Sequence, residues 1–408
     1  MVDANQPTSP QDEPKDPVKA TFFWGMAPVP LFDLPANFLA IGGTGSGKTI
    51  SLRMLLQSAL APVGRGLDHR VLIYDTDRTR ESVLKGMDPR CPVHVLNPSD
   101  PNAVAWDIAT DIANPRSAHQ LAASLLPRDP PAQPFFVDAA RNVLTAVLLG
   151  LIKLTPAKWT LNDVLFAVEG RDRLRTFLAQ APEAAAAVQA LIAEERVCAD
   201  LLATIATGLY PLRAVADRWQ KAPRKISLGH WLQDEGVLVL AGDPLTQGRA
   251  TPIVQAILGR LADLCFSSES SAARRTWIFL DDVPRAGRLE ALPALLQQGR
   301  HKGVCVVLAL NAVEALRQLY GEDDAELILA SCSHKTALRT DDPETAAWAE
   351  QCFGPPLRAR DLLTLPRPGP DNGLAGFHQT PERGTYFEHK PWDWVLAQLQ
   401  PPKSGAPD

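Results

Sequence analysis

A glycine-rich segment that ends in a lysine and a threonine has the clearest chemical signature in the sequence. It fits the pattern G-x-x-x-x-G-K-[ST] and reads Gly42-Gly43-Thr44-Gly45-Ser46-Gly47-Lys48-Thr49. The glycines let successive backbone N–H groups turn inward around a β-phosphate, and the following helix N-terminus adds partial positive charge. We expect Lys48 to reach the β- and γ-phosphates and the Thr49 hydroxyl to ligate Mg²⁺. The segment therefore predicts a nucleotide site.

The surrounding sequence favours this phosphate loop over a glycine-rich turn that carries a lysine by chance. The apolar run Phe38–Ile41 comes directly before the glycines and predicts a buried strand. The stretch Thr49–Leu60 after them is compatible with a helix. Strand, loop and helix in this order are the context that the motif requires.

Two adjacent carboxylates follow another apolar strand and supply the second half of such a site. The run reads Trp277-Ile278-Phe279-Leu280-Asp281-Asp282. We expect Asp281 to hold Mg²⁺, usually through water, and Asp282 to orient the attacking water. The alternative is that both acids simply begin a turn. For Asp75, at the end of the run Val71–Asp75, bracing a turn is the favoured interpretation.

The elements that must position these residues alternate like those of a parallel sheet covered on both faces. Short apolar runs between helical stretches predict strands at Phe38–Ile41, Val71–Asp75, Val93–Leu96, Val237–Ala241, Trp277–Asp281, Val304–Leu310 and Thr336–Leu338. The segment Phe22–Pro35 is predicted to be an extended lead-in. The fold class is therefore α/β, a phosphate-loop domain with a mainly parallel sheet.

A region rich in alanine and leucine interrupts this alternation. Between Arg116 and Arg218 strand signals vanish, and Phe135–Leu154 and Ala184–Ile205 are apolar at helical spacing. Thr160, three residues before Asp163, predicts a helix start. We divide the chain into a disordered arm (1–22), a nucleotide-binding domain in two parts (23–115 and 223–360), an inserted all-α domain (116–222) and a C-terminal extension of edge strands and loops (361–408).

The composition excludes several classes of protein. The 41 Lys and Arg against 46 Asp and Glu give a net charge of −5, which excludes coating nucleic acid by bulk positive charge. The six cysteines are far apart, so we expect neither a disulfide framework nor a structural zinc site. The apolar stretch Asn142–Ile152 falls short of the roughly 20 residues of a membrane helix, and the N-terminus lacks the regions of a signal peptide. We expect a cytoplasmic protein with no transmembrane segment.

The order of these motifs resembles that of the type IV coupling proteins of bacterial conjugation (the TraD/TrwB kind), relatives of the FtsK/HerA hexameric DNA motors. The likeness extends from about Phe23 to Gly354, with the helical insertion where the family carries an all-α domain. Its most specific part lies between Asp281 and Asn311 and includes Gly287-Arg288-Leu289, Leu292-Pro293, Gly299-Arg300 and Gly303.

The resemblance implies a RecA-like nucleotide-binding domain, assembled into a homohexameric ring with ATP and Mg²⁺ bound between neighbouring subunits. Arg300 matches the family arginine that reaches the phosphates of the adjoining subunit. Its alternative role is an exposed arginine at a helix end. Asn311 occupies the position where the family usually has glutamine at the end of the sensor strand. With Glu314 three residues on, Asn311 is also a good helix start, and both interpretations stay open.

The sequence departs from the family in several places. Asp282 replaces a glutamate and Asn311 a glutamine, each one methylene shorter, which implies slow turnover because a misplacement of about 1 Å costs roughly a hundredfold in rate. Ala36-Asn37 stands where some relatives carry a basic residue. Typical members begin with two membrane helices that this sequence lacks, so a separate membrane partner is expected, or action free in the cytosol.

A local basic run is the candidate for holding DNA. It consists of Arg213, Arg218, Lys221, Arg224 and Lys225, with Trp219 interleaved. This composition suits phosphate contacts with some base stacking, independent of sequence, although charge runs are usually solvated helix ends. Further basic candidates are Arg274, Arg275, Arg285 and Arg288.

The leading hypothesis is a coupling-protein-like ATPase that moves DNA, with its relaxase, toward a secretion channel. A cytosolic motor for DNA processing or defence is the nearest alternative. A protein of another class, whose assembly is gated by nucleotide with little turnover, is the third. All three share the phosphate loop, so they differ in partners and in rate.

Overall fold

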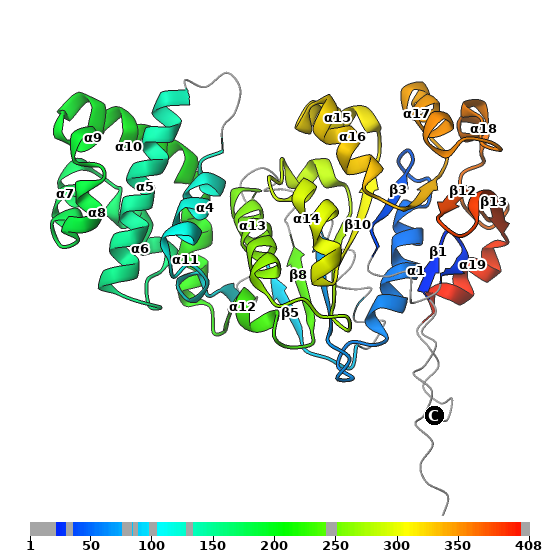
Figure 1. The fold of residues 1–408 in the computed structure, drawn as a ribbon, viewed down its shortest axis with the longest axis horizontal. Helices are drawn as coiled ribbons and strands as arrows, with labels where there is room; N and C mark the ends of the chain where they lie inside the picture. Colours follow the sequence, from blue (N-terminus) through cyan, green and yellow to red (C-terminus); the bar gives the residue numbers. More distant parts are fainter. Residues whose placement is uncertain are drawn as a thin grey trace, which may run out of the picture.

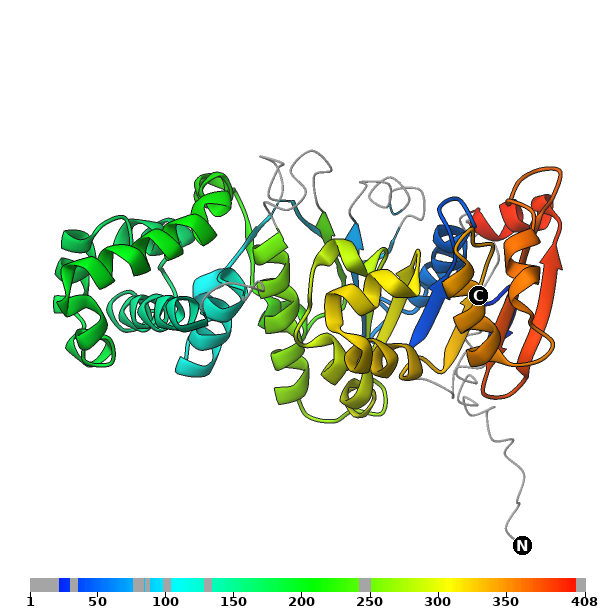
Figure 2. The ribbon, with the colours of Figure 1, turned by 90° about the horizontal axis from the view of Figure 1, so that it is seen from above.

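The structure is a computed structural model of the 408-residue chain. It describes residues 22–29, 36–75, 84, 89–97, 104–127, 134–241 and 251–400. The disordered arm predicted at 1–22 lies outside the described residues except for its last residue. A sheet-containing part carries a helical part at one end, as Figures 1 and 2 show.

A nine-stranded sheet forms the centre of the larger part. Its spatial order is β13 (Gly384–Lys390), β12 (Leu374–Thr380), β11 (His334–Ala337), β3 (Phe38–Ile41), β10 (Val304–Leu310), β9 (Arg275–Leu280), β4 (His69–Asp75), β8 (Val237–Ala241) and β5 (Val93–Leu96). Neighbours pair in parallel from β11 to β5, whereas β12 and β13 are antiparallel additions. Every strand predicted from the sequence is present, and the mainly parallel α/β fold is confirmed.

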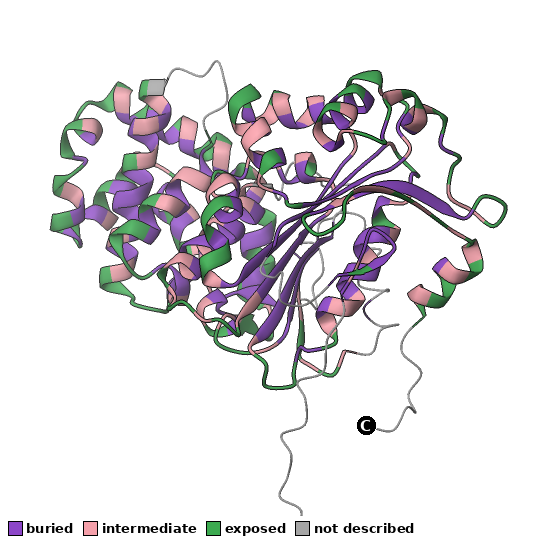
Figure 3. Cartoon of the chain, turned by 45° about the vertical axis from the view of Figure 1, so that its right-hand side comes forward, coloured by how far each residue is buried: buried purple, intermediate pink, exposed green. Residues whose placement is uncertain are grey.

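Alternate residues of the strands face two separate apolar cores, one on each side of the sheet. The central strands are buried along most of their length (Figure 3). On one side lie α1 (Lys48–Leu60) and a hairpin of β1 (Phe22–Trp24) and β2 (Ala27–Val29). The other side is covered by α13 (Thr251–Ser267), α14 (Leu292–Gln298), α15 (Val313–Tyr320) and α16 (Glu322–Ala330). Because both faces are buried, these strands are continuous apolar runs, which is why the sequence identified them.

The lead-in predicted as extended is a hairpin over its described residues. Strands β1 and β2 pair antiparallel, with Phe22 opposite Val29. The Phe22 ring lies 5.3 Å from the ring of Trp277 in β9, so the hairpin covers the centre of the sheet. Residues 30–35 of the predicted lead-in lie outside the described residues.

The inserted part is wholly helical over its described residues between α4 and α11, which confirms that prediction. Its elements are α4 (Pro115–Leu125), α5 (Pro134–Leu154), α6 (Leu161–Ala167), α7 (Arg171–Ala179), α8 (Pro182–Ala186), α9 (Gln189–Ala193), α10 (Glu195–Leu209), the 3-10 turn η2 (Tyr210–Leu212) and α11 (Arg213–Lys221). The apolar segment Ala184–Ile205 is divided among three helices. Thr160 and Asp163 form the predicted capping box at the start of α6.

Helix α5 is the central helix of this part and is longer than the apolar stretch noted in the sequence. Arg141 lies inside it, and its Nε donates to the carbonyl of Leu126 at 2.8 Å. By length and composition Phe135–Leu154 could cross a membrane, with a mean hydropathy of 1.7. However, 56% of this window is buried inside the fold, in the apolar core it shares with α4 and α10.

A buried carboxylate joins the two connections between the parts. The chain leaves the sheet through β6 (Ala105–Trp106) and α3 (Ile108–Asp111) and returns through β7 (Lys225–Ile226) and α12 (Leu228–Trp231), with β6 and β7 paired in parallel. Asp111, 3% exposed, accepts from Trp106 Nε1 at 2.6 Å on the outgoing chain. On the returning chain it accepts from Ser227 Oγ at 2.8 Å and the Leu228 N–H at 2.7 Å.

The C-terminal extension holds the predicted edge strands and also a helix that the sequence analysis missed. After α17 (Pro343–Phe353) and α18 (Ala359–Thr364), the strands β12 and β13 form one edge of the sheet. Helix α19 (Trp392–Leu399) then folds back beside α1, and Arg53 donates to the Leu399 carbonyl at 3.2 Å (Figure 1).

We predict that Asp111→Asn destabilises the protein by about 3 kcal/mol, since an amide group presents donors to partners that are themselves donors. The matched control is Asp107→Asn, because the Asp107 carboxylate is half-buried and accepts from Thr110 within its own short helix. Urea denaturation would measure both changes. Equal, small effects of the two substitutions would contradict the proposed joining role.

Candidate nucleotide site

The phosphate loop follows β3 at the edge of the sheet where the parallel strands end. Its first residues are fixed by backbone bonds to both neighbouring strands. The Gly42 N–H donates to the Leu310 carbonyl of β10 at 3.2 Å, and the Gly43 N–H donates to the Arg339 carbonyl after β11 at 2.8 Å. Helix α1 then begins at Lys48. The predicted order of strand, loop and helix is therefore present.

Two glycines of the loop are required by its shape. Gly47 has a φ of 101°, and a Cβ there would lie 2.6 Å from Leu374 Cδ1. A Cβ on Gly42 would lie 2.7 Å from the Ser46 hydroxyl. Larger residues at either position would push the backbone away from the curve that turns its N–H groups toward a phosphate.

Two polar side chains inside the loop have the arrangement expected of an anion site. Lys48 is buried, and its Nζ donates to the carbonyls of Gly42 at 2.6 Å and Gly43 at 2.8 Å. Burial lowers the pKa of Lys48, whereas Asp281 and Asp282 raise it. The buried Ser46 hydroxyl has no hydrogen-bond partner among the described residues. A phosphate in the loop would satisfy both groups.

Thr49 and Asp281 come together although they are 232 residues apart. The Thr49 hydroxyl lies 3.4 Å from Asp281 Oδ2. Asp281 reaches this position because β9 lies beside β10 and β10 beside β3, all parallel. A hydroxyl and a carboxylate at the mouth of a phosphate loop are oxygen ligands of the kind Mg²⁺ prefers. The residues present therefore fit a magnesium nucleotide.

Asp282 stands beside this pair in a strained conformation. Its φ of 57° is left-handed, which is uncommon for a residue with a side chain. Arg285 forms an ion pair with Asp282 Oδ2 at 2.9 Å, and Asn311 Nδ2 lies 3.4 Å from the same oxygen. The helix-start interpretation of Asn311 is wrong, because α15 begins at Val313 and Ala312 is its N-cap. The side chain of Asn311 faces Asp282 instead.

Arg300 lies at the amino ends of the parallel strands, whereas the phosphate loop of its own chain lies at their carboxyl ends. It belongs to the 3-10 turn η5 (Gly299–Lys302), which precedes β10, and its side chain is exposed. In β10, Leu310 is level with Ile41 at the loop, so the whole strand separates Arg300 from the site. At 3.3 Å per residue this distance is about 20 Å. Arg300 therefore does not reach the phosphate loop of its own chain.

Asn37 has a structural role at the same amino ends of the strands. It is 8% exposed, and its Nδ2 donates to the Leu296 carbonyl at 2.7 Å. Its Oδ1 accepts from the Val306 N–H at 3.2 Å. The position that departs from the family in the sequence is thus remote from the phosphate loop and joins β3 to β10.

The basic run is only partly available for DNA. Its five basic residues are exposed along α11 and the segment after it. Trp219, however, is 7% exposed and lies edge-on to Trp106 at 6.5 Å, so the expected base stacking on Trp219 is wrong. The other basic candidates have structural partners: Arg274 pairs with Asp68, Arg275 with backbone carbonyls, Arg285 with Asp282 and Arg288 with Glu290 and Asp324.

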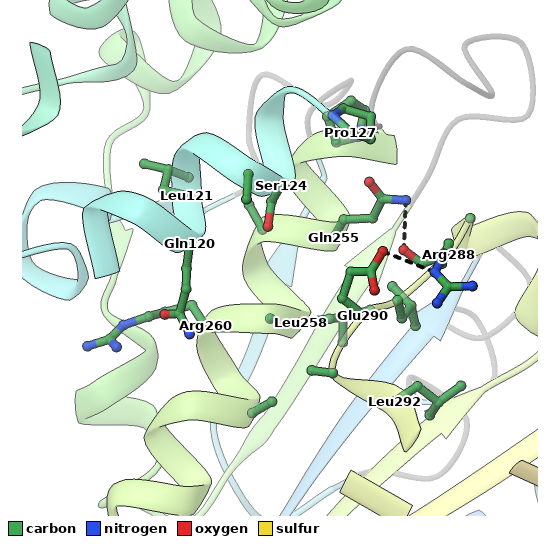
Figure 4. Close-up of a pocket in the computed structure, with 18 of the residues that line it drawn as sticks. Gln120, Leu121, Ser124, Pro127, Gln255, Leu258, Arg260, Arg288, Glu290 and Leu292 are labelled. Carbon is green, nitrogen blue, oxygen red and sulfur yellow. Dashed lines mark hydrogen bonds and ion pairs between the residues drawn. The ribbon is translucent and has the colours of Figure 1, made fainter. Parts of the chain in front are cut away.

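A cavity of about 1170 Å³ lies elsewhere, between α4, α13 and the segment before α14 (Figure 4). Arg288 crosses its wall and pairs with Glu290 at 3.0 Å, while Gln255 donates to the Arg288 carbonyl at 3.2 Å. None of the phosphate-loop residues lines it. This cavity could not be predicted from the sequence, because its lining comes from eight segments that are separated along the chain.

The comparisons with known proteins agree with this geometry. The family model described as "Type IV secretion-system coupling protein DNA-binding domain" matches residues 24–356. "Coupling protein TraD" of Escherichia coli (strain K12) is 24% identical over 331 residues, which are 77% of this chain and 43% of that protein. The chain thus spans less than half the length of this curated relative.

Solved structures of the coupling protein TrwB share the fold. The unbound monoclinic form of TrwBdeltaN70 has a TM-score of 0.74 and 19% identity, covering 91% of this chain and 88% of the other. TrwB in complex with the ATP analogue ADPNP has a TM-score of 0.73 and 21% identity, covering 91% and 89%. Because the family model matches most of the sequence, the chain belongs to the family of type IV secretion-system coupling protein DNA-binding domains.

Proposed function

We propose that this chain binds ATP with Mg²⁺ and hydrolyses it to ADP and phosphate. The observation that carries this proposal is the convergence of Lys48 and Thr49, after β3, with Asp281, after β9, at one phosphate loop. TrwB, whose fold this chain shares, has been solved with ADPNP and with ADP and Mg²⁺.

Each residue of the site has a defined part in this reaction. Lys48 exchanges the loop carbonyls it now contacts for the β- and γ-phosphate oxygens. Thr49 and Asp281 hold Mg²⁺, which neutralises charge on the triphosphate when bound. Asp282 orients the attacking water, and Asn311 donates toward the same place from the end of β10.

The same contacts favour slow turnover as a second candidate property. The Asp282 carboxylate already accepts from Arg285, so the oxygen that would orient water is engaged in an ion pair. Asp282 and Asn311 are also each one methylene shorter than the family residues. Both features support the alternative of a nucleotide-gated assembly protein with weak hydrolysis, which a rate measurement separates from a motor.

The location of Arg300 supports assembly into a ring, which we propose to be a homohexamer. The phosphate loop lies at the carboxyl ends of the strands and Arg300 at their amino ends. Repeated head-to-tail contacts would therefore bring Arg300 of one subunit to the site of the next. There its guanidinium would stabilise charge that develops on the transferred phosphoryl group.

The proposed role of this ring is to translocate DNA, independent of sequence, together with a relaxase toward a secretion channel. Membership in the coupling-protein family supports DNA as the partner. We propose a cytoplasmic location, with attachment to the inner membrane through a separate membrane or channel protein. A cytosolic DNA-processing or defence motor is the alternative, and co-purification with a relaxase or channel subunit would distinguish the two.

ATP hydrolysis by the purified chain, with and without single- and double-stranded DNA, tests the enzymatic proposal. We predict DNA-stimulated turnover that falls at least about a hundredfold in Lys48→Ala, since the amine stabilises transferring charge. Lys158→Ala, an exposed lysine in the helical part, is the matched control. ATP binding without turnover on any DNA would favour the assembly protein, and full activity of Lys48→Ala would refute the site.

Arg300→Ala tests action across subunits. We predict unchanged ATP binding and a loss of hydrolysis of about a thousandfold. Mixing Arg300→Ala with Lys48→Ala chains should restore part of the activity, because some interfaces then combine an intact loop with an intact arginine. His301→Ala is the neighbouring exposed control. Failure of the mixture to regain activity, with mixed rings present, would count against this role.

The basic run is tested by the double substitution Lys221→Ala and Arg224→Ala. Both side chains are exposed, so we expect a stable protein with ordinary ATP binding. DNA affinity should fall, and the slope of its logarithm against the logarithm of salt concentration should decrease by about 2. The same measurement on Lys158→Ala serves as a control, and an unchanged slope in the double variant would place the DNA contacts elsewhere.

A further inference from the structure

The C-terminal extension reaches the carboxyl ends of the parallel strands, where the phosphate loop lies. Strand β12 runs antiparallel to β11 and β13 antiparallel to β12, so β12 begins and β13 ends there. The loop before β12, residues 366–373, and the first residue of α19, Trp392, are therefore both close to the start of α1. Figure 1 shows α19, β12 and β13 together, next to α1.

Apolar contacts join this extension to the first turns of α1. A Cβ on Gly47 would lie 2.6 Å from Leu374 and 3.2 Å from Pro368 of that loop. Ile50, directly after Thr49, packs in a small apolar cluster with Met26, Met54, Leu374 and Val395. Trp392 and Trp394 border the same cluster and are only partly buried. The residues beside the loop thus present aromatic surface.

The two tryptophans differ in what covers them. The ammonium of Lys390 lies 5.5 Å from the ring centroid of Trp394, so a cation occupies one face of that ring. Trp392 packs against the apolar cluster that contains Met54 of α1, and its side chain remains partly exposed at the beginning of α19. Trp392 is therefore the better surface for a flat ligand.

The sheet order decides in which direction a bound nucleotide extends. Asp281 and Asp282 follow β9, and Asn311 follows β10, all on one side of the phosphate loop. The γ-phosphate and its metal must lie on that side, where their ligands are. The nucleoside, at the other end of the triphosphate, then leaves toward β11, β12 and β13, which is the side of Pro368 and Trp392.

We propose that Trp392, together with Pro368 of the loop before β12, forms the nucleoside-binding wall of this site and stacks against the purine of the bound nucleotide. Leu374 is fully buried and supports this wall from below. This inference rests on the proposed function, because it concerns the nucleoside of the same nucleotide whose phosphates the loop is proposed to bind. An aromatic ring recognises the flat face of any purine. In the adjoining loop Asn372 Nδ2 donates to the Arg367 carbonyl, so that amide serves the loop and does not read base edges.

The experiment compares the binding of ATP with that of inorganic tripolyphosphate, both with Mg²⁺, by calorimetry on the full chain. Tripolyphosphate has the charged groups of the nucleotide but no nucleoside. In Trp392→Ala we expect about tenfold weaker ATP binding, and tripolyphosphate binding within about twofold of the unmodified protein. Trp392→Phe keeps a ring and should restore most of the ATP affinity. GTP should bind within about threefold of ATP, since stacking is insensitive to the base edge.

Tyr210→Ala is the control, because Tyr210 is 71% exposed in the helical part. Equal losses for ATP and tripolyphosphate in Trp392→Ala would mean that Trp392 merely supports α1, which overturns the proposal. An unchanged ATP affinity would overturn it as well. If the unmodified protein bound tripolyphosphate but ATP no more tightly, the nucleoside wall would be refuted while the phosphate loop stood. Binding of neither ligand would refute the proposed function itself.

Discussion

The parallel pairing of β3, β10 and β9 is the constraint on which the site depends. Its register sets Ile41 level with Leu310 and Leu308 level with Leu280, so the loops after all three strands emerge at one edge. Segments separated by more than two hundred residues are thereby placed within hydrogen-bond distance of one another. Two backbone hydrogen bonds fix the first glycines of the loop, one to Leu310 of β10 and one to Arg339, two residues after β11. A change of one residue in the register would move Asp281 away from Thr49.

Much of this arrangement could be predicted because the physics is local. A strand buried on both faces is a continuous apolar run, and a phosphate loop between a strand and a helix has a fixed spacing. The capping box at Thr160 is likewise contained in four residues. Long-range partners were not predictable in this way. Trp219 is part of the core because Trp106, far away in the sequence, lies beside it, and nothing near Trp219 in the sequence indicates this.

Asn311 shows the same limit within the site. The pattern from Asn311 to Glu314 is a sound helix start, yet the helix takes Ala312 as its N-cap. The amide of Asn311 faces Asp282, which arrives from the adjacent strand in a left-handed conformation. A tertiary contact with a carboxylate replaces the local contact that the sequence favours. Helix α19 was missed for a related reason, because it is short and its apolar side packs on α1, which the sequence cannot place beside it.

The functional candidates lie at the two ends of the parallel strands. The carboxylates that suit a metal lie on one side of the phosphate loop, and the partly exposed tryptophans lie on the other. At the amino ends, Asn37 joins β3 to β10 while Arg300 is exposed in the turn that precedes β10. Within one chain, Lys48, Thr49 and Asp281 lie together at the phosphate loop, whereas Arg300 lies at the other end of β10. Strand β10 is buried along its whole length, and the roughly 20 Å that it spans exceeds the reach of an arginine side chain. The proposed catalytic role of Arg300 therefore requires a second copy of the chain.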